Sequence, residues 1–400
     1  MEPVLNALTM GFRPLWNAQR QLAGVQLFLH DDPDTVADTA HLLHMLREIW
    51  SPHAPQLLLS PQSPLLLQSL LTHATAHPLW AVEVDAQWLS THTELHAQIA
   101  EAAQRGVRLL WRGSVRQWPG VQARGDYALG LLHLLPQEAL RLMRDGAPAA
   151  PLQHQLFEEV HSQAVLHYCF AQNGIVAGWP EEDVLHRLRG SRVLHPSFDH
   201  VQHLLQAIEA DQSLDSLEAI LSEDPLLAYR LMLYANSAAV GARQPVTSLR
   251  RALALLGYSP LQTWLSAQLP QASHDVDLQP IRLRMVMRAQ MTSHLLDAGI
   301  SQELRSEVYL CGLLARLHDI LDEPVDTTLT RLPLSERIAD AIIHGQGPYA
   351  PSLQLALALE REDGGATIRS LCAEQGIALE HVNRSLLRLI CEWPNQHSCW

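Results

Sequence analysis

The hydrophobic pattern of the sequence changes near residue 195, and this change constrains the fold more than any other feature. Before it, short apolar runs alternate with segments of helical period. From about Phe198 onward, nearly every segment has helical period, with breaks at prolines and glycines. Alternating strands and helices are typical of an α/β domain with parallel strands, whereas an unbroken helical series is typical of an all-α domain. The sequence therefore predicts two domains, residues 1–193 and residues 194–400.

The α/β interpretation of the first domain depends on apolar runs that are separated by turns or helical segments. The polar run 17–21 predicts a turn between two strands. Thr35–Trp50 has apolar residues near helical period, and Thr93–Arg105 predicts a second helix that ends at Gly106, a residue suited to that position. The predicted strands are 24–29, 56–59, 79–84 and 107–111.

The chain contains no lysine, since all 28 of its basic residues are arginine, and its formal net charge is −14. A missing lysine excludes a P-loop nucleotide site, Schiff-base chemistry and a catalytic ammonium group. Neither half is basic, so we expect no binding to nucleic acid. Five cysteines without a CxxC pair favour a reduced, cytoplasmic protein over a disulfide framework.

Neither the N-terminus nor the interior predicts a membrane segment. Residues 1–9 carry Glu2 and no cation before a short apolar run, which is the reverse of a secretory signal. The longest apolar run, Leu57–Leu71, is interrupted by prolines and polar residues and stays short of the ~18 residues that a span requires. We therefore expect a cytoplasmic protein without a membrane partner.

The helical half contains one adjacent His-Asp pair, His318-Asp319, in a helical segment. Such a pair is the centre of the metal site in HD phosphohydrolases, which complete it with another His and another Asp. His294 and Asp340 are the loose candidates for those partners. The alternative interpretation is a solvated helix surface, which we favour because the pair alone cannot complete a coordination sphere.

Two other histidine pairs have the spacing of one helix face, and such pairs can bind a divalent ion. They are His41/His44 and His92/His96, the latter with Glu94 between its members. Neither pair has a third ligand nearby in the sequence, so solvated helix faces are the preferred interpretation. A further group at the tail, which we interpret as a frayed terminus, comprises Cys391, His397 and Cys399.

Residues 223–238 resemble the signature of HDOD domains, in which an acidic residue and proline begin a helix that ends in an Asn-Ser-Ala turn. Residues 248–257 resemble the next element of that family, a leucine-rich helix that closes on Leu-Gly. The resemblance implies an all-helical relative of HD hydrolases that has lost the metal ligands and acts by binding a protein partner. The signature residues are Asp224, Pro225, Asn236, Ser237, Leu256 and Gly257.

Residues 329–347 are similar to the branch of the family in which HDOD follows an EAL-type domain, and the first half carries weaker matches to that domain. Residues 24–30 resemble the EAL strand in which a glutamate binds metal and an arginine contacts cyclic-di-GMP. Gln26 and His30 stand at these two places. Residues 81–84 resemble the second acidic strand, so the resemblance implies that Glu83 is retained.

Two further EAL positions are altered. Residues 106–112 are similar to the strand that ends in paired aspartates, and Trp111-Arg112 (or Arg112-Gly113 in the other register) stand there. The catalytic lysine of the family falls near Leu129. Two-metal phosphodiester cleavage needs several carboxylates to balance two divalent cations. Trp and Arg would place bulk and positive charge at the metal positions, so we expect no metal, no cofactor and no enzymatic activity.

The resemblance implies a TIM-like barrel, which usually needs about 250 residues, whereas about 190 precede the helical half. We therefore expect a degenerate EAL-type barrel, incomplete or distorted, followed by an all-α HDOD domain. The leading hypothesis is a non-catalytic bacterial signalling protein within cyclic-di-GMP-related signalling. The alternatives are a cyclic-di-GMP receptor that uses Arg13 and Arg112 for phosphate, a weak metal-dependent phosphodiesterase, or an HD phosphohydrolase.

Overall fold

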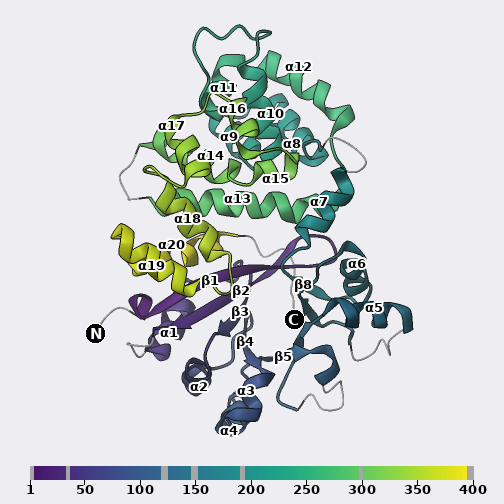
Figure 1. The fold of residues 1–400 in the computed structure, drawn as a ribbon, viewed down its shortest axis with the longest axis vertical. Coiled ribbons are helices and arrows are strands. Elements are labelled where there is room, and N and C mark those ends of the chain that lie inside the picture. The colour runs from purple at the N-terminus through teal and green to yellow at the C-terminus, as the bar shows by residue number, and fades with distance from the viewer. Residues whose placement is uncertain are drawn as a thin grey trace. The chain divides into compact units, whose positions relative to one another are not determined.

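The chain forms two compact units, each with its own core. The first contains Met1–Asp183 together with Ala358–Trp400, and the second is Val184–Leu357. In Figure 1 the first unit is purple to blue with yellow C-terminal helices, and the second is teal to light green. The computed structural model describes residues 4–32, 37–118, 125–145, 152–189, 194–296 and 301–393.

The first unit is a closed barrel of eight strands in sequential order. Strand β1 runs antiparallel to both of its neighbours, β2 and β8, and all other neighbouring pairs are parallel. The strands are β1 (Leu8–Trp16), β2 (Leu22–Asp31), β3 (Gln56–Pro61), β4 (Trp80–Asp85), β5 (Leu109–Ser114), β6 (Leu129–His133), β7 (Leu156–Glu158) and β8 (Ile175–Ala177).

This barrel confirms the predicted α/β layout and corrects two of its details. The strands close completely, so the barrel is not incomplete, because short strands and short helices fit it into fewer residues than usual. The first strand is antiparallel rather than parallel, because a hairpin joins it to β2. The predicted turn forms that hairpin, in which the Asn17 side chain accepts hydrogen bonds from the Gln19 and Gln21 backbone N–H groups.

Helices join most of the strands and cover the outside of the barrel. The helix predicted at Thr35–Trp50 begins one residue after Asp38, whose side chain accepts from the His41 N–H. The helix predicted to end at Gly106 is also present, and Gly106 has a positive φ of 79°. Within residues 1–183, the α-helices of the barrel unit are α1 (Thr39–Ile49), α2 (Pro64–His73), α3 (Ala86–Thr91), α4 (Glu94–Gln104), α5 (Pro136–Asp145) and α6 (Gln163–Ala171).

Two C-terminal helices, α19 (Gly365–Gln375) and α20 (Leu379–Glu392), belong to the barrel unit and pack on β1 (Figure 1). The buried Asn383 side chain accepts from the Met10 N–H and donates to the Leu5 and Leu8 carbonyls at 2.8 and 2.7 Å. The two compact units therefore differ from the predicted division into 1–193 and 194–400, because the last helices complete the barrel unit.

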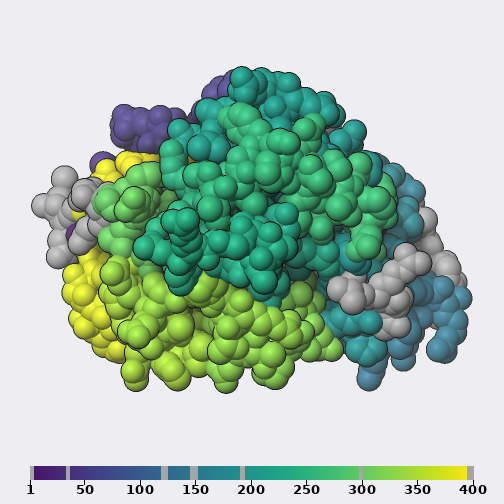
Figure 2. Space-filling view, turned by 90° about the horizontal axis from the view of Figure 1, so that it is seen from above, coloured from purple at the N-terminus to yellow at the C-terminus, as the bar shows by residue number. Residues whose placement is uncertain are grey.

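The described residues of the second unit form helices and no strand, as predicted. In Figure 2 it is seen from the side on which α11 and α12 lie, where its teal and green residues form a closely packed surface. None of the helices among the described residues is both long and apolar enough to cross a membrane. The α-helices of the second unit are α7 (Glu181–Arg189), α8 (Phe198–Glu209), α9 (Leu214–Ser222), α10 (Pro225–Ala235), α11 (Leu249–Leu256), α12 (Tyr258–Gln268), α13 (Gln279–His294), α14 (Gln302–Leu314), α15 (Leu317–Leu321), α16 (Val325–Thr330), α17 (Glu336–Ala339) and α18 (Ala350–Leu359).

Candidate functional site at the barrel mouth

The barrel interior contains an apolar layer and, next to it, a polar layer at the carboxyl ends of the parallel strands. The apolar layer includes Leu58, Leu110, Leu131 and Leu156, all fully buried. Side chains on a strand return to the same face every second residue, so the polar residues lie two positions away on most of these strands. The polar layer comprises Arg13 on β1, Gln26 on β2, Ser60 on β3, Glu83 on β4, Arg112 on β5, His133 on β6 and Glu158 on β7.

Arg112 lies among three carboxylates. Its Nε and Nη2 atoms donate to the two oxygens of Glu158 at 2.7 and 2.9 Å, which is a bidentate pair. Its Nη1 atom lies 3.2 Å from Glu83 Oε1 and 2.7 Å from Glu362 Oε1. Because the guanidinium reaches all three groups, it holds the centre of the barrel mouth.

A second arginine enters the same network through Gln26. Arg13 Nε and Nη2 donate to Gln26 Oε1 at 2.9 and 2.8 Å, and Gln26 Nε2 donates to Glu83 Oε2 at 2.7 Å. Arg13 Nη2 also lies 2.9 Å from Glu158 Oε2. The amide accepts through its oxygen and donates through its nitrogen, so it joins a cation to a carboxylate without any change of protonation. Gln26 is therefore a connecting member of the network.

Burial and pairing act differently on the two interior glutamates. Burial raises the pKa of Glu83 to about 7, although the Arg112 guanidinium opposes this change. Burial would also raise the pKa of Glu158, but Arg112 and Arg13 outweigh it and lower that pKa. For Arg112, desolvation is outweighed by Glu83 and Glu158, so its pKa is raised. At neutral pH Arg13 and Arg112 are therefore positive, Glu158 is negative and Glu83 is partly protonated.

The third carboxylate, Glu362, comes from the segment that follows α18. This segment approaches the barrel closely at two glycines. A Cβ atom on Gly11 would lie 3.1 Å from the Leu359 carbonyl oxygen, and one on Gly365 would lie 2.6 Å from the His30 ring. Burial lowers the pKa of His30, and the positive charge of Arg369 lowers it further. The mouth is therefore built from seven strands and one returning segment.

The donor set of the mouth does not suit divalent cations. A cation bound by Glu83 and Glu158 would have to displace the Arg112 guanidinium, which lies within 3.2 Å of both carboxylates. Gln26 adds only a neutral oxygen, and that oxygen already accepts from Arg13. In the part of the chain that the structure describes, no three His, Cys, Asp or Glu side chains form a cluster that could hold a metal. The Arg112 guanidinium therefore occupies the position between Glu83 and Glu158 that a bound cation would need.

The structure brings some of the predicted residues together and separates others. Gln26, Glu83 and Arg112 meet in one network, whereas His30 lies under the returning segment. Trp111 was expected to place bulk at the metal positions, but it points to the other face of β5, where its ring centroid lies 5.4 Å from that of Trp118.

Leu129, expected near the position of a catalytic lysine, packs against the apolar layer. The residue of β6 that reaches the network is instead His133, whose Nδ1 lies 3.2 Å from Glu158 Oε1. His133, Glu158 and Glu362 were missed from the sequence. Glu158 follows an apolar run at a strand end, which is a signal that could have found it, but nothing local connects Glu362 to the barrel.

In the helical unit, Asp224 is a structural centre. Its Oδ1 accepts from the Leu226 and Leu227 N–H groups at 2.9 and 3.0 Å, and thereby caps α10. Its Oδ2 accepts from the Ser197 N–H at 2.6 Å. Pro225 occupies the first turn of the same helix, where its missing N–H costs nothing. The acidic-proline start therefore fixes both the helix and the chain that leads into α8.

The other signature residues also organise the backbone. The Asn236 side chain accepts from the Val246 N–H and donates to the Met232 and Val246 carbonyls, which pins the loop after α10. Ser237 follows within the turn, where its N–H donates to the Tyr234 carbonyl. The last two residues of the signature end α11, at Leu256 and at Gly257, whose φ is 67°.

The possible metal ligands of the sequence do not assemble. His318 Nε2 lies 3.4 Å from the neighbouring Asp319, which also pairs with Arg316, and neither His294 nor Asp340 joins them in a cluster. His44 pairs with Glu48 on an exposed face of α1. His96 faces the Leu89 carbonyl at 3.2 Å. Of the group at the tail, His397 and Cys399 lie outside the described residues.

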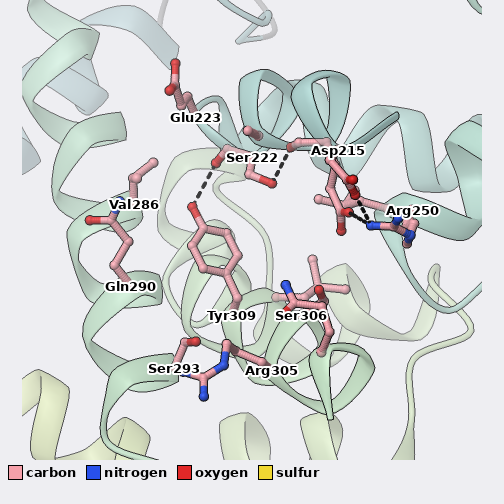
Figure 3. A pocket seen from close by; sticks show the side chains of 15 residues that line it. Asp215, Ser222, Glu223, Arg250, Val286, Gln290, Ser293, Arg305, Ser306 and Tyr309 are labelled. Carbon is pink, nitrogen blue, oxygen red and sulfur yellow. Dashed lines mark hydrogen bonds and ion pairs between the residues drawn. The ribbon is translucent and has the colours of Figure 1, made fainter. Parts of the chain in front are cut away.

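A pocket of about 440 Å³ opens in the helical unit between α9, α11, α13 and α14 (Figure 3). Tyr309 Oη donates to the Ser222 carbonyl at 3.1 Å, and Arg250 pairs with Asp215 and Glu218 on one wall. On the side opposite Glu223, Arg305 has no ion-pair partner among the described residues. The lining is Asp215, Glu218, Ala219, Ser222, Glu223, Leu249, Arg250, Val286, Gln290, Ser293, Gln302, Arg305, Ser306, Tyr309 and Leu310.

Comparison with known proteins identifies part of the helical unit. The model of the HDOD domain family matches residues 194–321, so the chain contains an HDOD domain. The cyclic di-GMP phosphodiesterase CdgJ of Vibrio cholerae is 26% identical over 173 residues, which are 43% of this chain and 39% of that protein. The uncharacterized protein YuxH of Bacillus subtilis is 21% identical over 199 residues, 48% of this chain and 47% of that protein.

The matched part of this chain therefore spans less than half the length of each of these curated relatives. Among solved structures, the MmoQ response regulator of Methylococcus capsulatus superposes with a TM-score of 0.42 and 20% identity. That superposition covers 49% of this chain and 98% of the MmoQ chain.

Proposed function

We propose that the chain is a non-catalytic signalling protein of cyclic-di-GMP-related regulation, in which a degenerate EAL-type barrel accompanies an HDOD domain that binds a protein partner. The HDOD match and the similarity to CdgJ support the signalling context. The observation that carries the non-catalytic assignment is the Arg112 guanidinium, which pairs with both Glu83 and Glu158.

An arginine at position 112 weakens metal binding more than the loss of a single metal ligand would, because it also occupies the carboxylates that remain. Two-metal phosphodiester cleavage requires carboxylates that are free to bind the cations, which in turn bind the oxygens of the substrate. Here Glu158 is saturated by the bidentate pair with Arg112, and Glu83 is held by Arg112 and Gln26. The chain also has no lysine for the catalytic position. The barrel is therefore a scaffold rather than a catalyst.

Turnover of cyclic-di-GMP by the full chain with Mn²⁺ or Mg²⁺ tests this proposal. We expect no hydrolysis and no stoichiometric Mn²⁺ binding by the wild type. A matched variant, Arg112→Asp with Gln26→Glu, restores acidic donors and is expected to gain Mn²⁺ affinity. Hydrolysis by the wild-type chain would overturn the proposal.

A second candidate function is that of a cyclic-di-GMP receptor. Arg13 and Arg112 both pair with the Glu158 carboxylate, so they lie close enough together to bind one phosphate group. Both guanidinium groups already have buried carboxylate partners, so we expect no binding in isothermal titration at micromolar protein. Measurable heat from cyclic-di-GMP would favour the receptor function instead.

For the partner, the pocket of the HDOD unit is the site that we propose. Its size lies within the range of sites that accept side chains or small ligands, and Arg305 there has no ion-pair partner among the residues that the structure describes. Affinity capture with the full chain is expected to recover a protein that Arg305→Glu loses. Arg243→Glu, on an exposed loop of the same unit, is the control and is expected to keep it. A partner retained equally by both variants would place the interaction elsewhere.

A further inference from the structure

The carboxylate of Glu362 differs from the other acidic groups of the barrel mouth in its origin and its exposure. Glu83 and Glu158 belong to strands and are nearly fully buried, whereas the Glu362 side chain is 32% exposed and comes from the returning segment. Its Oε1 lies 2.7 Å from Arg112 Nη1, and its Oε2 lies 3.5 Å from Arg13 Nη2. Two oxygens of one group thus bridge two guanidinium groups, which is how proteins bind an oxyanion.

We propose that Glu362 is an internal ligand of the barrel: Arg13 and Arg112 form an oxyanion site that the chain fills with its own carboxylate, which latches the returning segment onto the mouth. This inference goes beyond the proposed function, because it assigns a holding role to the mouth whether or not a partner binds the HDOD domain.

The charges of the mouth require such a ligand. Without Glu362, the two arginines face Glu158, which is ionised, and Glu83, which is partly protonated at neutral pH. The strand residues alone therefore leave an excess of positive charge in a partly buried site. One additional carboxylate neutralises this excess, and the returning segment supplies it at the position that both arginines reach.

The backbone around Glu362 is shaped for this position. The Arg361 N–H donates to the Ala358 carbonyl, and the Gly364 N–H donates to the Arg361 carbonyl, so the segment makes a tight turn between α18 and α19. A Cβ atom on Gly364 would lie only 2.2 Å from the Ala358 oxygen. Only glycine fits there, and it lets the turn bring Glu362 over the barrel.

The latch is separate from the contacts that dock the last helices. Those contacts are made by the Asn383 side chain on the β1 backbone, and by Arg369 Nη1, which donates to Thr9 Oγ1 at 3.0 Å. Loss of the Glu362 charge should therefore release the turn and leave α20 in place. This difference allows the latch to be tested in a folded chain.

Hydrogen–deuterium exchange on the full chain tests the latch. In Glu362→Gln we expect exchange of residues 359–365 to rise about tenfold or more, while α20 exchanges as in the wild type. Asp363→Asn is the matched control, because it removes a neighbouring carboxylate whose ion pair is with Arg361 and not with Arg13 or Arg112. It should exchange like the wild type at 359–365. Unchanged exchange in Glu362→Gln would overturn the proposal.

Titration with inorganic pyrophosphate gives an independent readout of the oxyanion site. Glu362→Gln is expected to bind pyrophosphate at least tenfold more tightly than the wild type, because the donor atoms of Arg13 and Arg112 that face Glu362 no longer have a charged partner there. Adding Arg13→Gln to that variant is expected to remove the gain. Equal binding by the wild type and Glu362→Gln would show that Glu362 does not occupy the site, and would refute the internal-ligand assignment.

Discussion

At the scale of single residues, Glu83 makes the barrel mouth sensitive to pH. Its pKa is about 7 in the folded chain and 4.5 in an unfolded one, because burial disfavours its charge. Between these values the folded chain binds more protons than the unfolded chain, so stability falls as pH rises through this range and is constant above it. Moving the pKa from 4.5 to about 7 corresponds to roughly 3 kcal/mol.

Replacing Glu83→Gln should remove this dependence, because a neutral amide keeps a hydrogen-bond acceptor without a charge. We expect the free energy of unfolding of the wild type to fall by up to about 3 kcal/mol relative to the variant between pH 5 and pH 8. Urea unfolding of both proteins at the two pH values measures the difference. Glu159→Gln, on the exposed residue next to Glu158, is the control. Parallel pH curves for the wild type and Glu83→Gln would contradict the assignment.

Residue patterns predicted part of the mouth. Gln26, Glu83 and Arg112 were found because the segments around them resemble strands of the EAL domain, and the ends of barrel strands converge. The error at Trp111 arose because a one-residue change of register moves a side chain to the other face of the strand. Glu362 lies far from the barrel in sequence, and only the tertiary fold brings it there.

At the scale of elements, the sequence predicted the positions of the strands better than it predicted whether they run parallel or antiparallel. The runs 24–29, 56–59, 79–84 and 107–111 correspond to β2, β3, β4 and β5. Alternation of strand and helix suggested parallel pairing throughout, but the short turn at 17–21 cannot support a parallel connection and forces β1 to be antiparallel. The turn was recognised from the sequence, and its consequence for strand direction was the part that was missed.

The start of α10 gives a prediction for one element. Asp224→Ala leaves the Leu226, Leu227 and Ser197 N–H groups without their acceptor in a buried setting. We expect a loss of about 3 kcal/mol in stability, from the cap and the buried donors together. Ser213→Ala removes the exposed cap of α9 and serves as the control, with an expected loss of about 1 kcal/mol. Urea unfolding followed by circular dichroism compares the two, and equal losses would contradict the central role of Asp224.

At the scale of the whole molecule, the barrel unit is discontinuous in sequence. Its last helices follow the helical unit, and α20 buries Val382, Leu386 and Ile390. A fragment of residues 194–400 would expose these side chains, whereas residues 184–357 form one compact unit. We expect the longer fragment to bind a hydrophobic dye strongly and to aggregate on size-exclusion chromatography, while the shorter one elutes as a monomer. Identical behaviour of the two fragments would contradict this division of the chain.

That discontinuity also sets an order of events during synthesis. Strands β1 to β8 leave the ribosome before Val184–Leu357, and α19 and α20 leave after it. At about 5–20 residues per second, translation of the intervening stretch takes roughly 10–35 seconds. For that time β1 lacks the helices that pack on it, so the nascent barrel can complete this side only after the helical unit has left the ribosome.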